Sequence, residues 1–177
     1  MSRVGNKIIK VPEGVDVKFD GNVFTAKGKL GTQTVTIPMS VGYTNEDGTI
    51  SFSRSSERPQ NRADHGLARA LVNNAIVGVS EGFRKVLELE GTGYKWDVRG
   101  RDVVLTVGYS HPVNIPLPEG INAEVKGGTM TITGADKQLV GFVAARIFDK
   151  KRVEPYKGKG IKYQGQYVRR KAGKAGA

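Results

Sequence analysis

The 177-residue chain contains no cysteine and only two histidines, His65 and His111. Without cysteine, disulfide bonds and thiolate metal sites are excluded. The two histidines lie far apart in the sequence, and isolated histidines are more often structural residues than metal ligands. The sequence therefore predicts no metal site and no cofactor.

Long apolar runs are also missing. The longest are far shorter than the ~20 residues that a membrane helix needs. The first residues, Met-Ser-Arg-Val-Gly-Asn-Lys, show neither the apolar region of a signal peptide nor an amphipathic transit pattern. A composition of 38% hydrophobic and 25% charged residues allows a packed core. We therefore expect a soluble, cytoplasmic protein that does not enter a membrane.

Motifs for catalysis or nucleotide binding are absent. The Gly-x-Ser-x-Gly run at residues 78–82 lies at the end of the first expected helix and not on a strand-to-helix turn, so it does not form a nucleophile elbow. The runs at 91–93 and 158–160 contain Gly-x-Gly but lack the spacing of a phosphate-binding loop or a dinucleotide-binding fingerprint. Glu88 and Glu90 alternate with leucines, which a solvated strand face explains. The sequence favours a protein that is not an enzyme and has no small-molecule substrate.

The net charge of +11 is distributed unevenly. Residues 150–177 hold ten Lys or Arg and a single acid, Glu154, whereas residues 1–149 are nearly neutral. Charge that served only solubility would be scattered along the chain. Its concentration at one end indicates a polyanionic partner, and by charge alone nucleic acid and an anionic membrane both qualify.

Short alternating segments predict antiparallel strands. Val15, Val17 and Phe19 share one face, and Asp20-Gly21 is typical of a hairpin turn. The chain returns over residues 23–26. Further strands are expected at residues 7–11, 34–37, 49–53, 85–90, 94–99 and 102–107.

Two apolar stripes with helical spacing predict two amphipathic helices. We expect Asp64 to cap the first helix and Asp136 the second. The stripes consist of Ala68, Val72, Ala75, Ile76 and Val79, and of Val140, Val143, Ala144 and Ile147.

Residues 12–28 match residues 118–134 at a constant offset of 106, and six residues are identical. The identities fall on turn residues and the apolar character is kept, which favours two copies of one fold. We therefore predict an α+β protein made of two tandem repeats, residues 1–82 and 83–152. Each is expected to be a small antiparallel sheet with one helix packed on a face. Residues 153–177 form a basic C-terminal extension.

The extension carries the candidate binding residues. It has too many glycines and lysines for a core element. Glycines without Cβ atoms let backbone N–H groups approach phosphate, lysines supply charge, and tyrosines, Tyr167 included, can stack on bases or ribose. We expect residues 153–163 to be ordered. The predicted site is Tyr156, Lys157, Gly158, Lys159, Gly160, Lys162, Tyr163, Arg169, Arg170 and Lys171.

A second candidate patch lies in the polar loop before the first helix. It consists of Arg54, Arg58 and Arg62. Arginines on a polar loop are commonly only solvated, so simple solvation is the alternative interpretation.

Residues 154–163, Glu-Pro-Tyr-Lys-Gly-Lys-Gly-Ile-Lys-Tyr, resemble the signature of ribosomal protein six of the bacterial-type large subunit. The runs Ser-Arg-Val-Gly-Asn-Lys at 2–7 and Glu-Gly-Thr-Gly-Tyr at 90–94 resemble the same family. Val153 departs from it, because the family usually has Pro or Ser there. The absence of an organellar extension favours a bacterial origin.

The resemblance implies a structural component of the large ribosomal subunit, with no catalysis. It implies binding to 23S rRNA near the base of the lateral stalk and the factor-binding region. Neighbouring ribosomal proteins would be partners and translation factors would lie nearby. By position, the family's main rRNA contacts fall on residues 156–160 and Lys162.

The residues alone leave two alternatives. One is an enzyme acting on a phosphorylated substrate, with Lys157 or Lys159 as the electrophile. No convincing base or nucleophile accompanies those lysines. The other is a protein that binds a membrane surface, which is disfavoured because the extension has no long apolar helical face.

Overall fold

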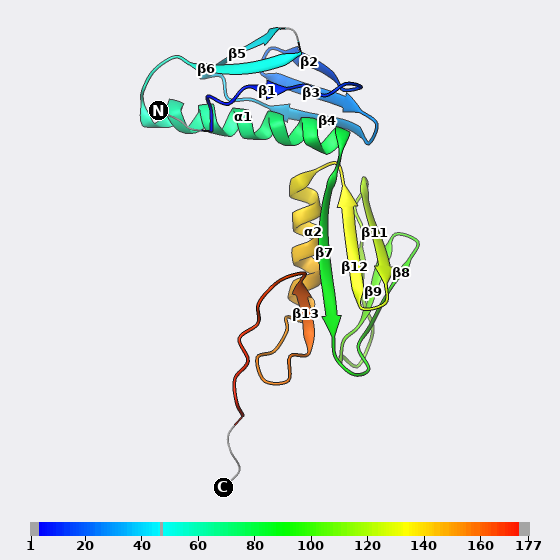
Figure 1. Ribbon diagram of the computed structural model, residues 1–177. Helices are drawn as coiled ribbons and strands as arrows, with labels where there is room; N and C mark the ends of the chain where they lie inside the picture. The colour runs from blue at the N-terminus through cyan, green and yellow to red at the C-terminus, as the bar shows by residue number, and fades with distance from the viewer. Residues whose placement is uncertain (1–3, 47, 174–177) are drawn as a thin grey trace. The chain divides into compact units, whose positions relative to one another are not determined.

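The computed structural model describes residues 4–46 and 48–173. The chain divides into two compact units. The first extends to Phe83 and includes Ala135–Lys137, and the second comprises Arg84–Gly134 and the chain from Gln138 onward. Both combine antiparallel sheets with one helix, so the predicted α+β fold class is confirmed (Figure 1). Among the described residues, no helix is long and apolar enough to cross a membrane.

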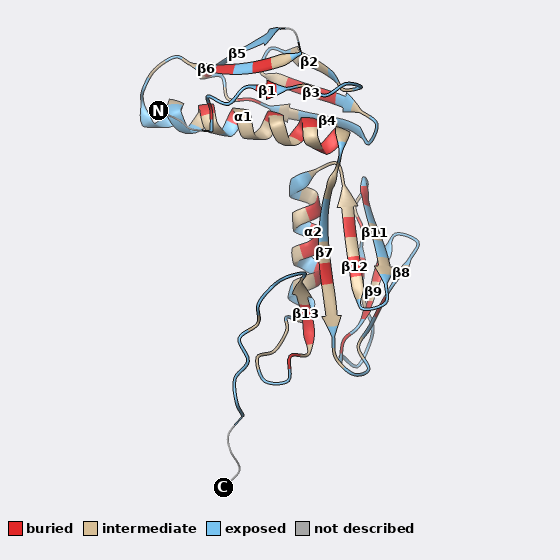
Figure 2. Ribbon diagram, viewed as in Figure 1, coloured by how far each residue is buried: buried red, intermediate tan, exposed pale blue. Residues whose placement is uncertain are grey.

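The first unit contains six strands and a long helix. They are β1 (Ile9–Lys10), β2 (Asp16–Asp20), β3 (Val23–Gly28), β4 (Gly31–Thr36), β5 (Val41–Glu46), β6 (Thr49–Arg54) and α1 (Pro59–Ser80). They form two three-stranded sheets, ordered β1-β6-β5 and β2-β3-β4. α1 packs against strands of both sheets. Its five predicted stripe residues are all buried, together with Phe24 and Ile50 from the strands (Figure 2).

The predicted start of the first helix is wrong. α1 begins at Pro59 with Arg58 at the N-cap position, five residues before Asp64. Proline suits the first helical position because its φ is already helical and its missing N–H would have no partner there. The Asp64 carboxylate instead accepts hydrogen bonds from Ser40 Oγ at 2.6 Å and from Gln60 Nε2 at 2.8 Å.

The second unit contains seven strands and a shorter helix. They are β7 (Phe83–Glu90), β8 (Lys95–Arg99), β9 (Asp102–Thr106), β10 (Val113–Pro116), β11 (Ile121–Lys126), β12 (Thr129–Gly134), α2 (Lys137–Lys150) and β13 (Gly160–Tyr163). The sheets are ordered β10-β9-β8 and β11-β12-β7-β13. All four predicted stripe residues of α2 are buried. The sequence patterns missed β5, β10 and β13.

The two units repeat one topology. In each, a first strand (β1 or β7) pairs with the last strand before the helix (β6 or β12), and a separate three-stranded sheet lies between them in the sequence. β5 and β6 therefore correspond to β11 and β12. The alignment at offset 106 instead matched β2–β3 with β11–β12, two hairpins that occupy different sheets, and that alignment is wrong.

The offset of 106 was misleading because the mismatched hairpins share their geometry. Asp16 pairs with Lys27 as Asn122 pairs with Thr133. The topological repeat instead has an offset of 80, which places Val41 on Ile121. In the sequence, this repeat is visible as the similarity of Gly-Thr-Ile-Ser-Phe-Ser at 48–53 to Gly-Thr-Met-Thr-Ile-Thr at 128–133.

Part of the basic segment belongs to the core, contrary to expectation. β13 pairs antiparallel with β7, with Ile161 opposite Leu89. Ile161 is fully buried, and Figure 2 shows part of β13 coloured as buried. One aliphatic side chain between glycine and lysine is thus enough to anchor an edge strand of the sheet.

Candidate nucleic-acid interface

The signature loop, residues 154–159, is closed by its own backbone. Glu154 N–H donates to Lys159 O at 2.9 Å, and Gly158 N–H donates to Glu154 O at 3.2 Å. At the base of the loop, Ile161 N–H donates to Lys151 O at 2.7 Å. The buried β13 strand therefore holds one end of a loop that hydrogen bonds of its own backbone close.

Gly158 and Gly160 allow the loop to close in this way. Gly158 has φ +71°, and a Cβ there would lie 2.7 Å from the Arg170 guanidinium. Gly160 has φ +137°, and a Cβ there would lie 2.6 Å from Val153 Cα. The Gly158 N–H already donates to Glu154 O within the protein, and its contact with a phosphate stays a prediction. Both glycines allow close packing within the protein.

The chain beyond β13 returns to the signature loop. Lys171 N–H donates to Pro155 O at 3.0 Å, and the Arg170 guanidinium lies against Gly158. Arg169 neighbours them in the sequence, and all three side chains are exposed. The structure thus brings the predicted residues of the loop and of the tail together on one surface.

Lys162, another predicted site residue, is engaged in ion pairs. Its Nζ donates to the Glu90 carboxylate and lies 3.5 Å from Glu88 Oε2. The hydrogen bond to Glu90 raises the pKa of Lys162 above its ordinary value. Two carboxylates from β7 thus neutralise this cation, and its predicted RNA contact requires that these pairs open.

Tyr163 packs against the helix. Its ring centroid lies 5.1 Å from that of Phe148, and Lys85 Nζ lies 5.9 Å from the ring. Burial raises the pKa of the Tyr163 hydroxyl. Tyr156 and Tyr167, by contrast, are 56% and 87% exposed and have free surface for stacking.

We call the solvent-accessible part of this arrangement the C-terminal cationic surface. None of its five cations forms an ion pair with a carboxylate in the described part of the chain. Unpaired cations around an exposed ring can bind phosphate and stack on a base or ribose. The surface consists of Tyr156, Lys157, Lys159, Arg169, Arg170 and Lys171.

The second predicted patch is not a cluster of free cations. Arg54 is 13% exposed, pairs with Glu57 at 2.6 Å, and donates from Nη1 to His65 Nδ1 at 3.0 Å. The hydrogen bond from Arg54 lowers the pKa of Glu57. Arg58 and Arg62 remain exposed at the start of α1.

His65 is a buried core residue, as its isolation in the sequence suggested. It is 2% exposed. Its Nε2–H donates to Phe52 O at 3.0 Å while Nδ1 accepts from Arg54. A Cβ on Gly5 would lie 2.6 Å from the His65 ring, so the backbone packs directly on the imidazole.

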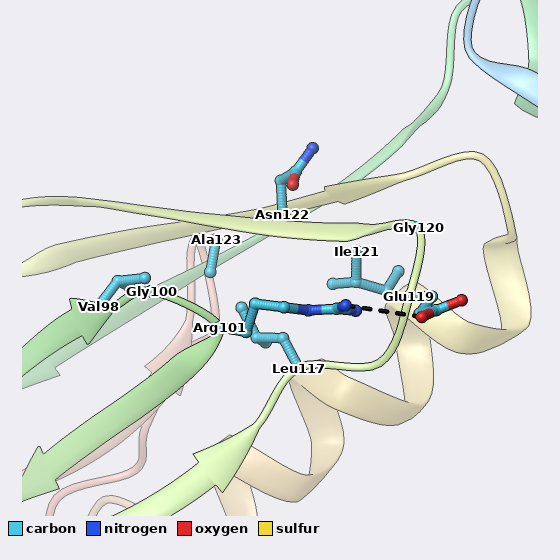
Figure 3. A pocket seen from close by; sticks show the side chains of 9 residues that line it. All are labelled: Val98, Gly100, Arg101, Leu117, Glu119, Gly120, Ile121, Asn122 and Ala123. Carbon is cyan, nitrogen blue, oxygen red and sulfur yellow. Dashed lines mark ion pairs between the residues drawn. The ribbon is translucent and has the colours of Figure 1, made fainter.

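A pocket of the second unit offers no catalytic constellation (Figure 3). Arg101 and Glu119 form an ion pair at its edge, with Nη1 and Oε1 3.7 Å apart. Its other side chains are aliphatic or, at Asn122, an amide. Across residues 4–46 and 48–173, no group of three His, Asp or Glu side chains could hold a metal ion.

Comparison with known proteins gives a consistent result. A family model described as ribosomal protein L6 matches residues 11–82 and 90–164. The chain is 51% identical to a protein of Maridesulfovibrio salexigens, with 99% of each chain covered. It is 49% identical to one of Staphylococcus epidermidis, again over 99% of each. It is 48% identical to one of Rubrobacter xylanophilus, over 99% of this chain and 100% of the relative. All three are described as large ribosomal subunit protein uL6.

Proposed function

The chain belongs to the ribosomal protein L6 family, and from this premise we propose that it binds 23S rRNA through its C-terminal cationic surface. The family is structural and non-enzymatic, and its members are components of the large subunit of the cytoplasmic ribosome. The role of this chain is therefore that of a structural constituent of the large ribosomal subunit.

The observation that supports the rRNA contact is the set of unpaired cations around the signature loop. Lys162 and Arg54 are held by carboxylates, whereas Lys157, Arg169, Arg170 and Lys171 pair with no carboxylate in the part of the chain that the structure describes. An exposed, unpaired cation can release counterions from a phosphate backbone, which is the main source of affinity for RNA. Tyr156 adds a ring for stacking at the same place.

We further propose that this contact lies near the base of the lateral stalk and the factor-binding region. The support is the resemblance of residues 154–163 to the family signature. Neighbouring large-subunit proteins are then partners, and translation factors act nearby. The nearly neutral first unit fits a scaffold or a protein-facing surface better than a main rRNA contact.

The test is competitive incorporation into large subunits. A Lys157→Ala, Lys159→Ala double variant and wild-type protein, carrying different tags, are co-expressed and counted in purified subunits. The variant should be depleted, and the slope of its affinity for rRNA against salt should fall by about 0.7–0.9 for each phosphate that it no longer neutralises.

The matched control is Lys18→Ala, Lys27→Ala, which removes the same charge from exposed positions on β2 and β3. Equal depletion of both double variants would mean that net charge alone matters. Incorporation of the Lys157, Lys159 variant at the wild-type level would refute the assignment of the surface.

A further inference from the structure

We propose that the solvent-facing side of α2 is a second RNA-binding surface, on which Phe142 stacks on a base or ribose and Arg146 binds a phosphate. This inference rests on the proposed binding to 23S rRNA. It concerns residues outside the C-terminal cationic surface. We call Gly141, Phe142, Ala145 and Arg146 the α2 surface.

Phe142 is the first observation. The buried stripe of α2 faces the sheet, yet Phe142 is 58% exposed on the opposite side of the helix. The Arg146 guanidinium, one turn further on, lies 5.8 Å from the ring centroid. Arg146 is exposed and forms no ion pair with any described carboxylate. A ring beside an unpaired guanidinium is a combination that binds single-stranded RNA.

Gly141 is the second observation. It lies within α2, where glycine destabilises a helix relative to alanine. A Cβ at Gly141 would have no atom within 4 Å, and its φ is not positive, so neither packing nor backbone conformation requires glycine. The missing side chain, next to Phe142 and one turn before Ala145, leaves room for another molecule to approach the helix backbone.

The charge around α2 favours RNA as that molecule. Lys150, Lys151 and Arg152 follow at the C-terminal end of the helix. Asp149, the only acid of α2, is paired with Arg152 at 2.7 Å. A surface for a protein partner would not need this excess of cations, whereas a phosphate backbone does.

Aromatic residues near the same helix also favour RNA as the partner. Tyr109 OH donates to Lys150 O at 2.6 Å, and Lys151 Nζ lies 5.6 Å from the Tyr109 ring. Such cation–aromatic pairs occur about once per 70–80 residues in proteins. The described residues form five such cation–aromatic pairs, and four of these pairs lie in the second unit.

The exposed apolar residues of the two units differ in kind. Among the described large hydrophobic residues, those exposed in the first unit are mostly aliphatic and those exposed in the second are aromatic, and aromatic rings are the side chains that stack on bases. The sets are Val4, Ile8, Leu30, Met39, Tyr43 and Leu67 in the first unit, and Tyr109, Phe142, Tyr156 and Tyr167 in the second.

The test measures the affinity of the full chain for deproteinised 23S rRNA. Phe142→Ala should weaken binding about fivefold or more, the effect of losing one stacked base. Arg146→Gln should lower the salt slope by about 0.7, the value for one phosphate of a single strand. Gly141→Ala should raise the melting temperature and still weaken binding, a combination that a purely structural role would not produce. Leu67→Ala, a similarly exposed helix residue of the first unit, is the matched control and should bind as wild type.

The outcomes separate this inference from the proposed function. Failure of the wild-type chain to bind rRNA would overturn both. If the Lys157, Lys159 variant binds rRNA more weakly than wild type, but the three α2 variants bind as wild type does, this inference alone is overturned. If Phe142→Ala binds free rRNA normally but is incorporated less into subunits, the α2 surface contacts a protein and not RNA.

Discussion

Replacing Gly160 by alanine should destabilise the second unit by about 3 kcal/mol. Gly160 has φ +137°, a conformation essentially restricted to glycine that costs another residue about 1–3 kcal/mol. The new Cβ would also lie 2.6 Å from Val153 Cα and 2.7 Å from Arg152 O. Because these are backbone atoms, the chain at 152–153 must move, which breaks the Val153 N–H to Ile161 O bond of 3.2 Å. That loss adds about 1 kcal/mol.

Gly165→Ala is the matched control. Gly165 also has positive φ, +76°, but a Cβ there would have no atom within 4 Å. Only the cost of the left-handed conformation remains, about 1–2 kcal/mol. The difference between the two variants therefore contains the steric contact between Gly160 and the 152–153 backbone, the hydrogen bond that this contact breaks, and the difference between the two backbone conformations.

The assay is urea unfolding followed by tryptophan fluorescence. Trp96, the only tryptophan, lies in the second unit, is buried, and donates from Nε1 to Gly127 O at 3.1 Å. Its emission therefore reports on unfolding of that unit. If Gly160→Ala proves no more destabilising than Gly165→Ala, the close packing of Gly160 against the backbone is not what holds the signature loop.

Three further predictions concern buried or paired side chains. Ile161→Ala should cost about 2–5 kcal/mol in the same fluorescence assay, because it empties a fully buried site. The raised pKa of Lys162 means that its pairing with Glu90 stabilises the fold throughout neutral pH. The stability difference between wild type and Lys162→Met, measured by urea unfolding against pH, should therefore persist from neutral pH to about 10.5 and shrink as pH rises through the raised pKa; a difference that disappears near neutral pH would contradict this. Arg54→Met should lower the stability of the first unit by about 1–3 kcal/mol in calorimetry, because it leaves His65 Nδ1 buried without a donor; an unchanged transition would refute that role.

Most local structure could be predicted from the sequence. The helical stripes are buried in the structure because a 3.6-residue period places their members on one side of a helix. The Asp20-Gly21 turn closes β2 onto β3 because glycine accepts the positive φ of a hairpin turn, here +58°. The strands β5 and β10 were missed because their apolar residues do not alternate clearly. The start of α1 was missed because a proline, not an acidic cap, begins it.

The candidate site was predictable in composition but not in arrangement. The charge gradient and the signature run located the basic segment correctly within the chain. Residues of similar types in this segment have different roles in the structure, however. Ile161 is core, Lys162 is neutralised, and Tyr163 packs on a helix, while Tyr156 and Lys157 remain exposed. Phe142 was missed as a surface residue because a phenylalanine in an apolar helix resembles core.

The α+β class, the two helices and the family could be recognised from the residues alone. These properties follow from local periodicity, turn chemistry and a contiguous run of residues. Strand pairing in the tertiary structure was needed to show which hairpins of the two units correspond and which cations have no carboxylate partner among the described residues. Glu90 reaches Lys162 across 72 residues because β13 pairs with β7, and no local pattern encodes that pairing. A cation's availability for phosphate depends on such long-range partners, so it becomes visible only once the strands are placed side by side.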